Sequence, residues 1–231
     1  MHVDRANEVA LAPESVRQVY RRRARRYDLT SHLYGLLGYR LDAYRREGIR
    51  ELALRPGCTV VEIGCGTGAN LELLRDGVGN SGHVIGVDLT DAMLELARAR
   101  VARHGWTNVE LVLADAEAFL FPDRVDAVFS SYALTLVPGF DAVVRNAARA
   151  LVPGGRMVVV DFKAPERWPR WLLRAIVPLL RPFAVTLALA QRHPWESIAK
   201  HFARSWVTER YLRATYIAVG VTGPGVTRST L

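Results

Sequence analysis

The sequence contains little cysteine and almost no lysine. Its two cysteines, Cys58 and Cys65, flank one apolar segment and lack the spacing of a disulfide framework or a metal site. No uncharged apolar run reaches the 18 or more residues that cross a bilayer. The first residues are polar and charged, unlike a secretory signal. These absences argue against the disulfide-rich secreted class and the membrane-spanning class, and they predict a cytoplasmic protein.

The chain is basic, with a formal net charge of +8 at pH 7. Of its 31 basic residues, Lys163 and Lys200 alone are lysines. A GC-rich genome would explain the preference for arginine but not the excess of positive charge, which attracts nucleic acids, anionic membranes or acidic substrates. At 231 residues, half of them hydrophobic, the chain can form one domain with a full core and an appended layer.

A glycine-rich turn is the most informative local pattern. The β-branched run Val60–Ile63 leads into Gly64–Gly68, which has glycine at every second position, and helically spaced leucines follow from Leu71. This order predicts a strand, a tight turn and a helix, whose free N–H groups and dipole face the turn. Nicotinamide sites use Gly-x-Gly-x-x-Gly instead. An acid before the turn, Glu62, also suits a cationic amino acid better than a pyrophosphate.

Two further acids stand at predicted strand ends. The segment 83–88 ends in Asp88, about 20 residues beyond the turn, where a carboxylate can bind both hydroxyls of a ribose. The segment 109–113 leads to Asp115, which is placed to bind an adenine edge. Because parallel strands end at one edge of a sheet, the three acids converge on one crevice. A ligand with an amino acid, a ribose and an adenine is S-adenosylmethionine.

These motifs identify a family. Val61–Gly68, Gly86–Asp88 and Leu151–Gly155 resemble, in the expected order, the motifs of class I S-adenosylmethionine-dependent methyltransferases, over roughly residues 50–162. The resemblance implies an α/β, Rossmann-like sheet of seven strands, mostly parallel with the last strand antiparallel, and S-adenosylmethionine as the cofactor. The residues expected to contact it are Tyr20, Tyr27, Glu62, Gly64, Cys65, Gly66, Thr67, Gly68, Asn70, Asp88, Leu89, Met93, Asp115, Ala116 and Ser130.

We expect a single domain with additions at both ends of this core. Residues 1–50 would form an N-terminal helical cap, 51–162 the cofactor-binding core, 163–200 a helical lid and 201–222 closing strands. A basic amphipathic helix beginning at Pro13 either lies on an anionic bilayer surface or packs on its own domain. The lid region is rich in aromatic and aliphatic residues interleaved with arginines and is broken by prolines, which favours an apolar acceptor.

Two segments are similar to the lipid-acting branch of the family, which includes phospholipid and betaine-lipid N-methyltransferases and quinone C-methyltransferases. They are Tyr27–Gly38 and Ser130–Pro138. The second segment is similar to the betaine-lipid N-methyltransferases, and its residues Ser131–Leu134 do not match the quinone enzymes well. The similarity implies that Tyr20 and Tyr27 cap the cofactor and that Tyr132 faces the acceptor, although Tyr132 could also be buried for packing. The catalytic candidates are Tyr132, Tyr27 and Asp161. No carboxylate cluster predicts a metal site.

The interpretation favours methyl transfer to a small amphipathic or lipid-like acceptor, with N-methylation of an amine headgroup first. The alternative is C-methylation of a quinone or another aromatic or polyketide-like ring. A nucleic-acid-binding protein or RNA methyltransferase is a third hypothesis, which the absence of an Asn-Pro-Pro-Tyr-like motif disfavours. Peripheral contact of the basic helix with an anionic membrane is left open, nucleic acid is not expected, and the oligomeric state is open.

Overall fold

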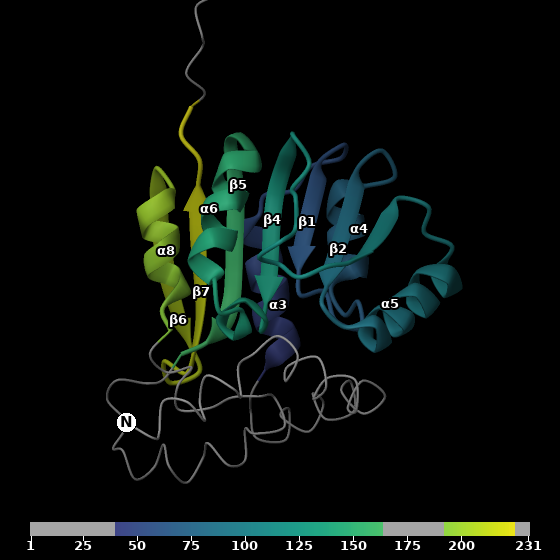
Figure 1. The fold of residues 1–231 in the computed structure, drawn as a ribbon, viewed down its shortest axis with the longest axis horizontal. Helices are drawn as coiled ribbons and strands as arrows, with labels where there is room; N and C mark the ends of the chain where they lie inside the picture. The colour runs from purple at the N-terminus through teal and green to yellow at the C-terminus, as the bar shows by residue number, and fades with distance from the viewer. Residues whose placement is uncertain (1–39, 164–191, 225–231) are drawn as a thin grey trace, which may run out of the picture.

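A computed structural model describes residues 40–163 and 192–224, which form one twisted sheet with helices on both faces (Figure 1). The sheet has seven strands in the order β3-β2-β1-β4-β5-β7-β6. The strands are β1 Thr59–Ile63, β2 His83–Asp88, β3 Val109–Leu113, β4 Val125–Ser131, β5 Leu151–Phe162, β6 Arg204–Arg210 and β7 Thr215–Val221. The helices of the described part are α3 Leu41–Glu51, α4 Leu71–Val78, α5 Asp91–His104, the short 3₁₀ helix η1 Leu134–Leu136, α6 Phe140–Ala150 and α8 Pro194–His201.

The strand directions confirm the predicted fold class. β1 pairs in parallel with β2 and β4, and the parallel region extends to β3 and β5. β7 is antiparallel both to β5 and to β6, because a hairpin inserts it between them. The sheet is therefore mostly parallel and its last strand is antiparallel, as in Rossmann-like methyltransferases.

The sheet has a buried core on each face. Val60 points to the face covered by α3 and α4, and the adjacent Val61 points to the face covered by α6 and α8. Both side chains are fully buried. A strand covered on both faces needs apolar residues at consecutive positions rather than alternating ones, which explains the continuous apolar run before the glycine turn.

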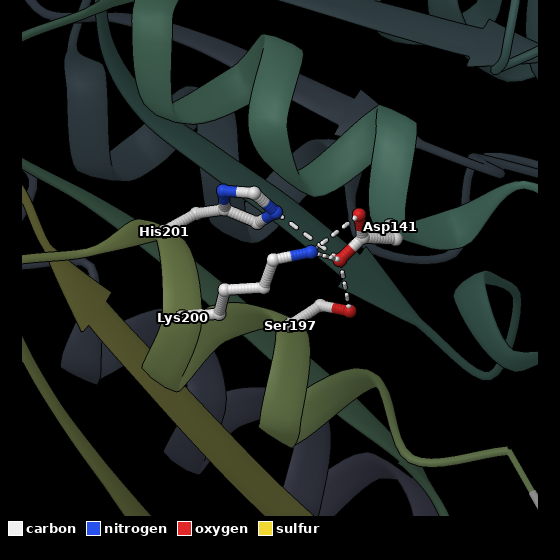
Figure 2. Close-up of polar contacts among 4 residues, drawn as sticks. All are labelled: Asp141, Ser197, Lys200 and His201. Atoms are coloured by element: carbon white, nitrogen blue, oxygen red, sulfur yellow. Dashed lines mark hydrogen bonds and ion pairs between the residues drawn. The ribbon is translucent and has the colours of Figure 1, made fainter.

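The two helices on the second face are joined by a polar cluster around Asp141 of α6 (Figure 2). Its Oδ1 accepts hydrogen bonds from Ser197 Oγ at 2.9 Å and His201 Nε2 at 3.1 Å, and its Oδ2 lies 3.2 Å from Lys200 Nζ. Residues 194–200, at the end of the range expected to form a lid, thus belong to α8 and pack on α6.

Several expectations fall on parts of the chain outside the described residues. These are the basic helix from Pro13, the contacts of Tyr20 and Tyr27, and the apolar insertion up to residue 191. Within the described ranges, the helices are too short or too polar to span a bilayer.

Candidate functional site

A cavity opens at the carboxyl ends of the parallel strands. It contains about 820 Å³ of empty space, part of it open to solvent, and residues that follow β1, β2, β3 and β4 line it. Ligands of open α/β sheets bind at this edge. Eight of the residues predicted from the sequence line the cavity: Gly64, Gly66, Asp88, Leu89, Met93, Asp115, Ala116 and Tyr132.

The glycine turn forms the floor of the cavity and needs glycine for two different reasons. Gly64 has φ +72°, and a Cβ there would lie 2.2 Å from the Cβ of Ala133, so the turn packs directly on the segment after β4. Gly66 has φ +55°, and a Cβ there would meet no atom within 4 Å. The backbone at Gly66 is therefore exposed to the space that a ligand would fill.

Asp88, at the end of β2, is held in one orientation by backbone donors. Its Oδ2 accepts a hydrogen bond from the N–H of Gly66 at 2.8 Å, and its Oδ1 accepts one from the N–H of Thr90 at 2.8 Å. Burial raises the pKa of this carboxyl, and these two hydrogen bonds oppose the increase. Asp88 itself lines the cavity, so its oriented carboxylate is accessible to a ligand.

Asp115, after β3, lies on the same side of the cavity. Its Oδ1 accepts a hydrogen bond from the N–H of Glu117 at 2.9 Å, which orients the carboxylate. Ala116, Met93 and Leu89 line the cavity beside it. A carboxylate next to apolar side chains suits a ligand that has a flat ring with an exocyclic amine.

Glu62 is fully buried beneath the turn and is only partly paired. Its Oε1 accepts a hydrogen bond from Asn70 Nδ2 at 2.6 Å, and the same amide donates to Ser131 Oγ at 2.9 Å. Glu62 Oε2 and Asn70 Oδ1 have no hydrogen-bond partner among the described residues. Burial raises the pKa of Glu62 to about 8, against the opposing effects of the Asn70 hydrogen bond and the charge of Arg45. Two unpaired buried acceptors fit a cationic hydrogen-bond donor.

Other predicted contacts do not line the cavity. Besides Glu62, they are Cys65, Thr67, Gly68, Asn70 and Ser130. Ser130 Oγ donates a hydrogen bond to the carbonyl of Ile63 at 3.0 Å, joining β4 to β1, and the next residue, Ser131, lines the cavity instead. Successive side chains of a strand point in opposite directions, so a one-residue error reverses the assignment.

The three catalytic candidates differ in their position relative to the cavity. Tyr132 lines the cavity; its ring centroid lies 4.9 Å from that of Phe162 and 5.4 Å from Arg45 Cζ. Asp161 does not line it. This carboxylate is 2% exposed and its Oδ2 accepts a hydrogen bond from the N–H of Thr135 at 2.9 Å. Burial raises the pKa of Asp161 to about 6. Tyr27 lies outside the described residues.

The sequence analysis pointed to the segment after β4 through Tyr132, but it left several other residues that line the cavity out of the predicted site. Ala133, Leu136, Val137 and Pro138 line the cavity after β4, as do Val87 and Thr90 beside Asp88. The signal that could have identified them is their position, because they immediately follow the carboxyl end of a central parallel strand. In the described part of the chain, no group of three or more His, Cys, Asp or Glu side chains is arranged to hold a metal ion.

Comparisons with known proteins agree with this geometry. A methyltransferase domain family model matches residues 54–187. The ubiquinone/menaquinone biosynthesis C-methyltransferase UbiE of Hahella chejuensis is 36% identical over 152 residues, which are 65% of this chain and 60% of that protein. A demethylmenaquinone methyltransferase of Listeria monocytogenes is 29% identical over 160 residues, which are 68% of this chain and 66% of that protein. The chain thus spans about 60–66% of the length of these relatives.

A solved structure extends the comparison to the fold. Phosphoethanolamine N-methyltransferase 2 of Haemonchus contortus, in complex with S-adenosylmethionine, superposes with a TM-score of 0.63 at 17% identity. The match covers 78% of this chain and 52% of that one. The predicted family and cofactor are thereby confirmed. With the family model matching more than half of its residues, the chain belongs to the methyltransferase domain family and has the fold of the S-adenosylmethionine-dependent enzymes.

Proposed function

We propose that the protein transfers a methyl group from S-adenosylmethionine to a ring carbon of a quinol. The observation that carries this proposal is the similarity to two quinone-directed methyltransferases over about two thirds of the chain. It favours the second of the two acceptor classes considered from the sequence. N-methylation of an amine headgroup stays a prediction, since the N-methyltransferase that shares the fold is only 17% identical.

Residues that line the cavity, together with the buried Glu62 and Asn70, which do not line it, fit the proposed cofactor. The unpaired Oε2 of Glu62 and Oδ1 of Asn70 provide buried acceptors for an ammonium group. The carboxylate of Asp88 is oriented for the ribose hydroxyls, and Asp115 with its apolar neighbours suits the adenine. The open backbone at Gly66 leaves room for the chain between them.

The other cavity wall supports an apolar aromatic acceptor. Tyr132, Ala133, Leu136, Val137 and Pro138 line it, and none of these side chains carries a charge. Such a wall excludes water and can align a flat ring with the methyl group. In our proposal, the hydroxyl of Tyr132 lies near the acceptor and assists removal of its proton.

When bound, S-adenosylmethionine supplies a methyl group already activated on a sulfonium. In carbon methylation the quinol first loses a phenolic proton, which makes the adjacent ring carbon nucleophilic. The C–C bond would then form as the S–CH₃ bond breaks, the ring hydrogen would leave as a proton, and the phenolate oxygen would take a proton back, so that one proton is released overall. The protein therefore has to align the reactants and accept and return protons, and Tyr132 provides a phenol in the cavity wall for this purpose.

The test uses the full chain with S-adenosylmethionine and demethylmenaquinone that has been chemically reduced to the quinol. We expect a product heavier by about 14 Da, the mass of one CH₂, on the ring carbon. A parallel reaction contains phosphatidylethanolamine vesicles instead of the quinol. Methylation of the lipid amine with no methylation of the quinol would overturn the proposal in favour of N-methylation.

A further inference from the structure

The wall formed by η1 cannot hold its own shape. η1 is a 3₁₀ helix of three residues, and Leu136 together with the next two residues lines the cavity. A single helical turn is intrinsically unstable, because it fixes several backbone torsions for very few hydrogen bonds. The position of this wall therefore depends on contacts with other parts of the chain.

Side chains from distant elements bind both ends of η1. At the N-terminal end, Asp161 of β5 accepts the hydrogen bond of the Thr135 N–H at 2.9 Å. At the C-terminal end, Arg192 Nη1 donates to the carbonyl of Thr135 at 3.1 Å and to that of Val137 at 3.0 Å. These carbonyls belong to the Thr135–Leu136 and Val137–Pro138 peptide groups, so one guanidinium nitrogen binds the backbone on both sides of the Leu136–Val137 pair, which lines the cavity. Both ties are charge-assisted and stronger than ordinary amide hydrogen bonds.

A third hydrogen bond joins this segment to the loop after β3. Glu117 Oε1 accepts a hydrogen bond from the N–H of Gly139 at 2.8 Å. Glu117 stands two residues after Asp115, which lines the cavity, whereas Gly139 directly follows Pro138, which also lines it. The carboxylate of Glu117 also attracts the guanidinium of Arg192. Residues 135–139 are thus bound by two acids, Asp161 and Glu117, and one base, Arg192, all from outside their own segment.

We infer that Arg192 is a positioning residue for methyl transfer. By binding the carbonyls of Thr135 and Val137, it holds residues 134–138, the η1 wall, at a fixed position relative to the cofactor. It acts through this wall and is not placed against the reacting atoms. The inference rests on the proposed function, in which the η1 wall orients the acceptor. A displacement of about 1 Å in an active site can lower the rate by about 100-fold.

The chain offers a matched control. Arg156 Nη1 donates to the carbonyl of Glu51 at 2.8 Å, which is the same kind of bond, but it joins β5 to the end of α3 and lies outside the cavity. We compare Arg192→Met with Arg156→Met in the full chain. Arg192→Met should lower kcat for the reduced demethylmenaquinone about 10- to 100-fold and change the Kd of S-adenosylhomocysteine less than about threefold. Arg156→Met should leave both within about twofold, even if it lowers the melting temperature equally.

Amide hydrogen exchange of the peptide that contains residues 132–139 gives a readout that needs no acceptor. Arg192→Met should accelerate its exchange about tenfold, Arg156→Met should leave it unchanged, and Arg192→Lys, which keeps the charge but can reach fewer carbonyls, should be intermediate. Unchanged exchange in Arg192→Met, or an equal loss of kcat in Arg156→Met, overturns the inference. If the wild-type protein does not methylate the quinol, the proposed function fails, while the exchange experiment still decides whether Arg192 holds the wall.

Discussion

Binding of S-adenosylmethionine should release a proton from Glu62. Without a ligand, burial raises the pKa of this carboxyl to about 8, compared with an ordinary value of 4.5. The preference of the folded state for protonated Glu62 therefore adds to the free energy of unfolding in full below about pH 4.5, and this addition is lost as the pH rises to about 8. A ligand ammonium next to the unpaired Oε2 would favour the ionised form and lower the pKa again.

The size of the effect follows from two titrations. At pH 7 about one in ten empty sites has an ionised Glu62, because its pKa is about 8. The ligand's own amino group, with a pKa near 7.8, must be protonated. The product of the two fractions rises about eightfold between pH 6 and pH 7, reaches a maximum near pH 8 and then falls. At pH 7 about 0.8 proton should be released per binding event, because Glu62 loses about 0.9 proton while the ligand amine gains about 0.1.

Calorimetric titrations in two buffers with different ionisation enthalpies measure both the affinity and the protons released. Glu62→Gln is the matched variant, because it keeps the shape of the side chain but cannot ionise. It should lose the rising part of the pH profile and release no proton. If the wild type binds with equal affinity at pH 6 and pH 7, or if Glu62→Gln keeps the wild-type slope, the assignment of Glu62 to the ammonium is wrong.

Three other outcomes are expected. Gly66→Ala should lower the affinity for S-adenosylhomocysteine, measured by calorimetry, at least about tenfold. Gly154 also has a positive φ and open space around it but lies outside the cavity, so Gly154→Ala should only lower the free energy of unfolding by about 1–2 kcal/mol. Equal affinities of the two variants would contradict this prediction. Tyr132→Phe should reduce quinol turnover about 100-fold with unchanged nucleoside affinity, and full turnover would exclude its hydroxyl from proton transfer. Asp141→Asn should lower the melting temperature by roughly 1–3 °C at pH 7, where the aspartate is ionised. The hydrogen bond from Ser197 is the main reason that the pKa of Asp141 is lower in the folded protein than its ordinary value of 3.8. The difference in melting temperature should therefore disappear as the pH falls below 3.8 and through the lower pKa of the folded state. A difference that persists in acid would contradict this prediction.

Much of the cofactor side of the cavity could be predicted because its signals are local. A strand, a turn that needs glycine and an acid at the strand end are properties of short segments, and parallel strands bring such ends to one edge. Asp88, Asp115, Gly64 and Gly66 therefore lie in the cavity as expected. The sheet of seven strands with its last strand antiparallel also followed, once the family resemblance was recognised.

The tertiary structure alone decided which polar residues face the cavity and which are buried for structural reasons. Asp161 lies near the carboxyl end of β5 just as Asp88 lies at the end of β2, yet it binds the N–H of Thr135, 26 residues away, in η1. Arg192 has no local motif, and its role depends on carbonyls 55 and 57 residues away. Sequence determines where strands, turns and charges lie along the chain. Contacts between distant segments, and the face to which each side chain turns, exist only after the sheet has assembled, so a linear pattern could not reveal them.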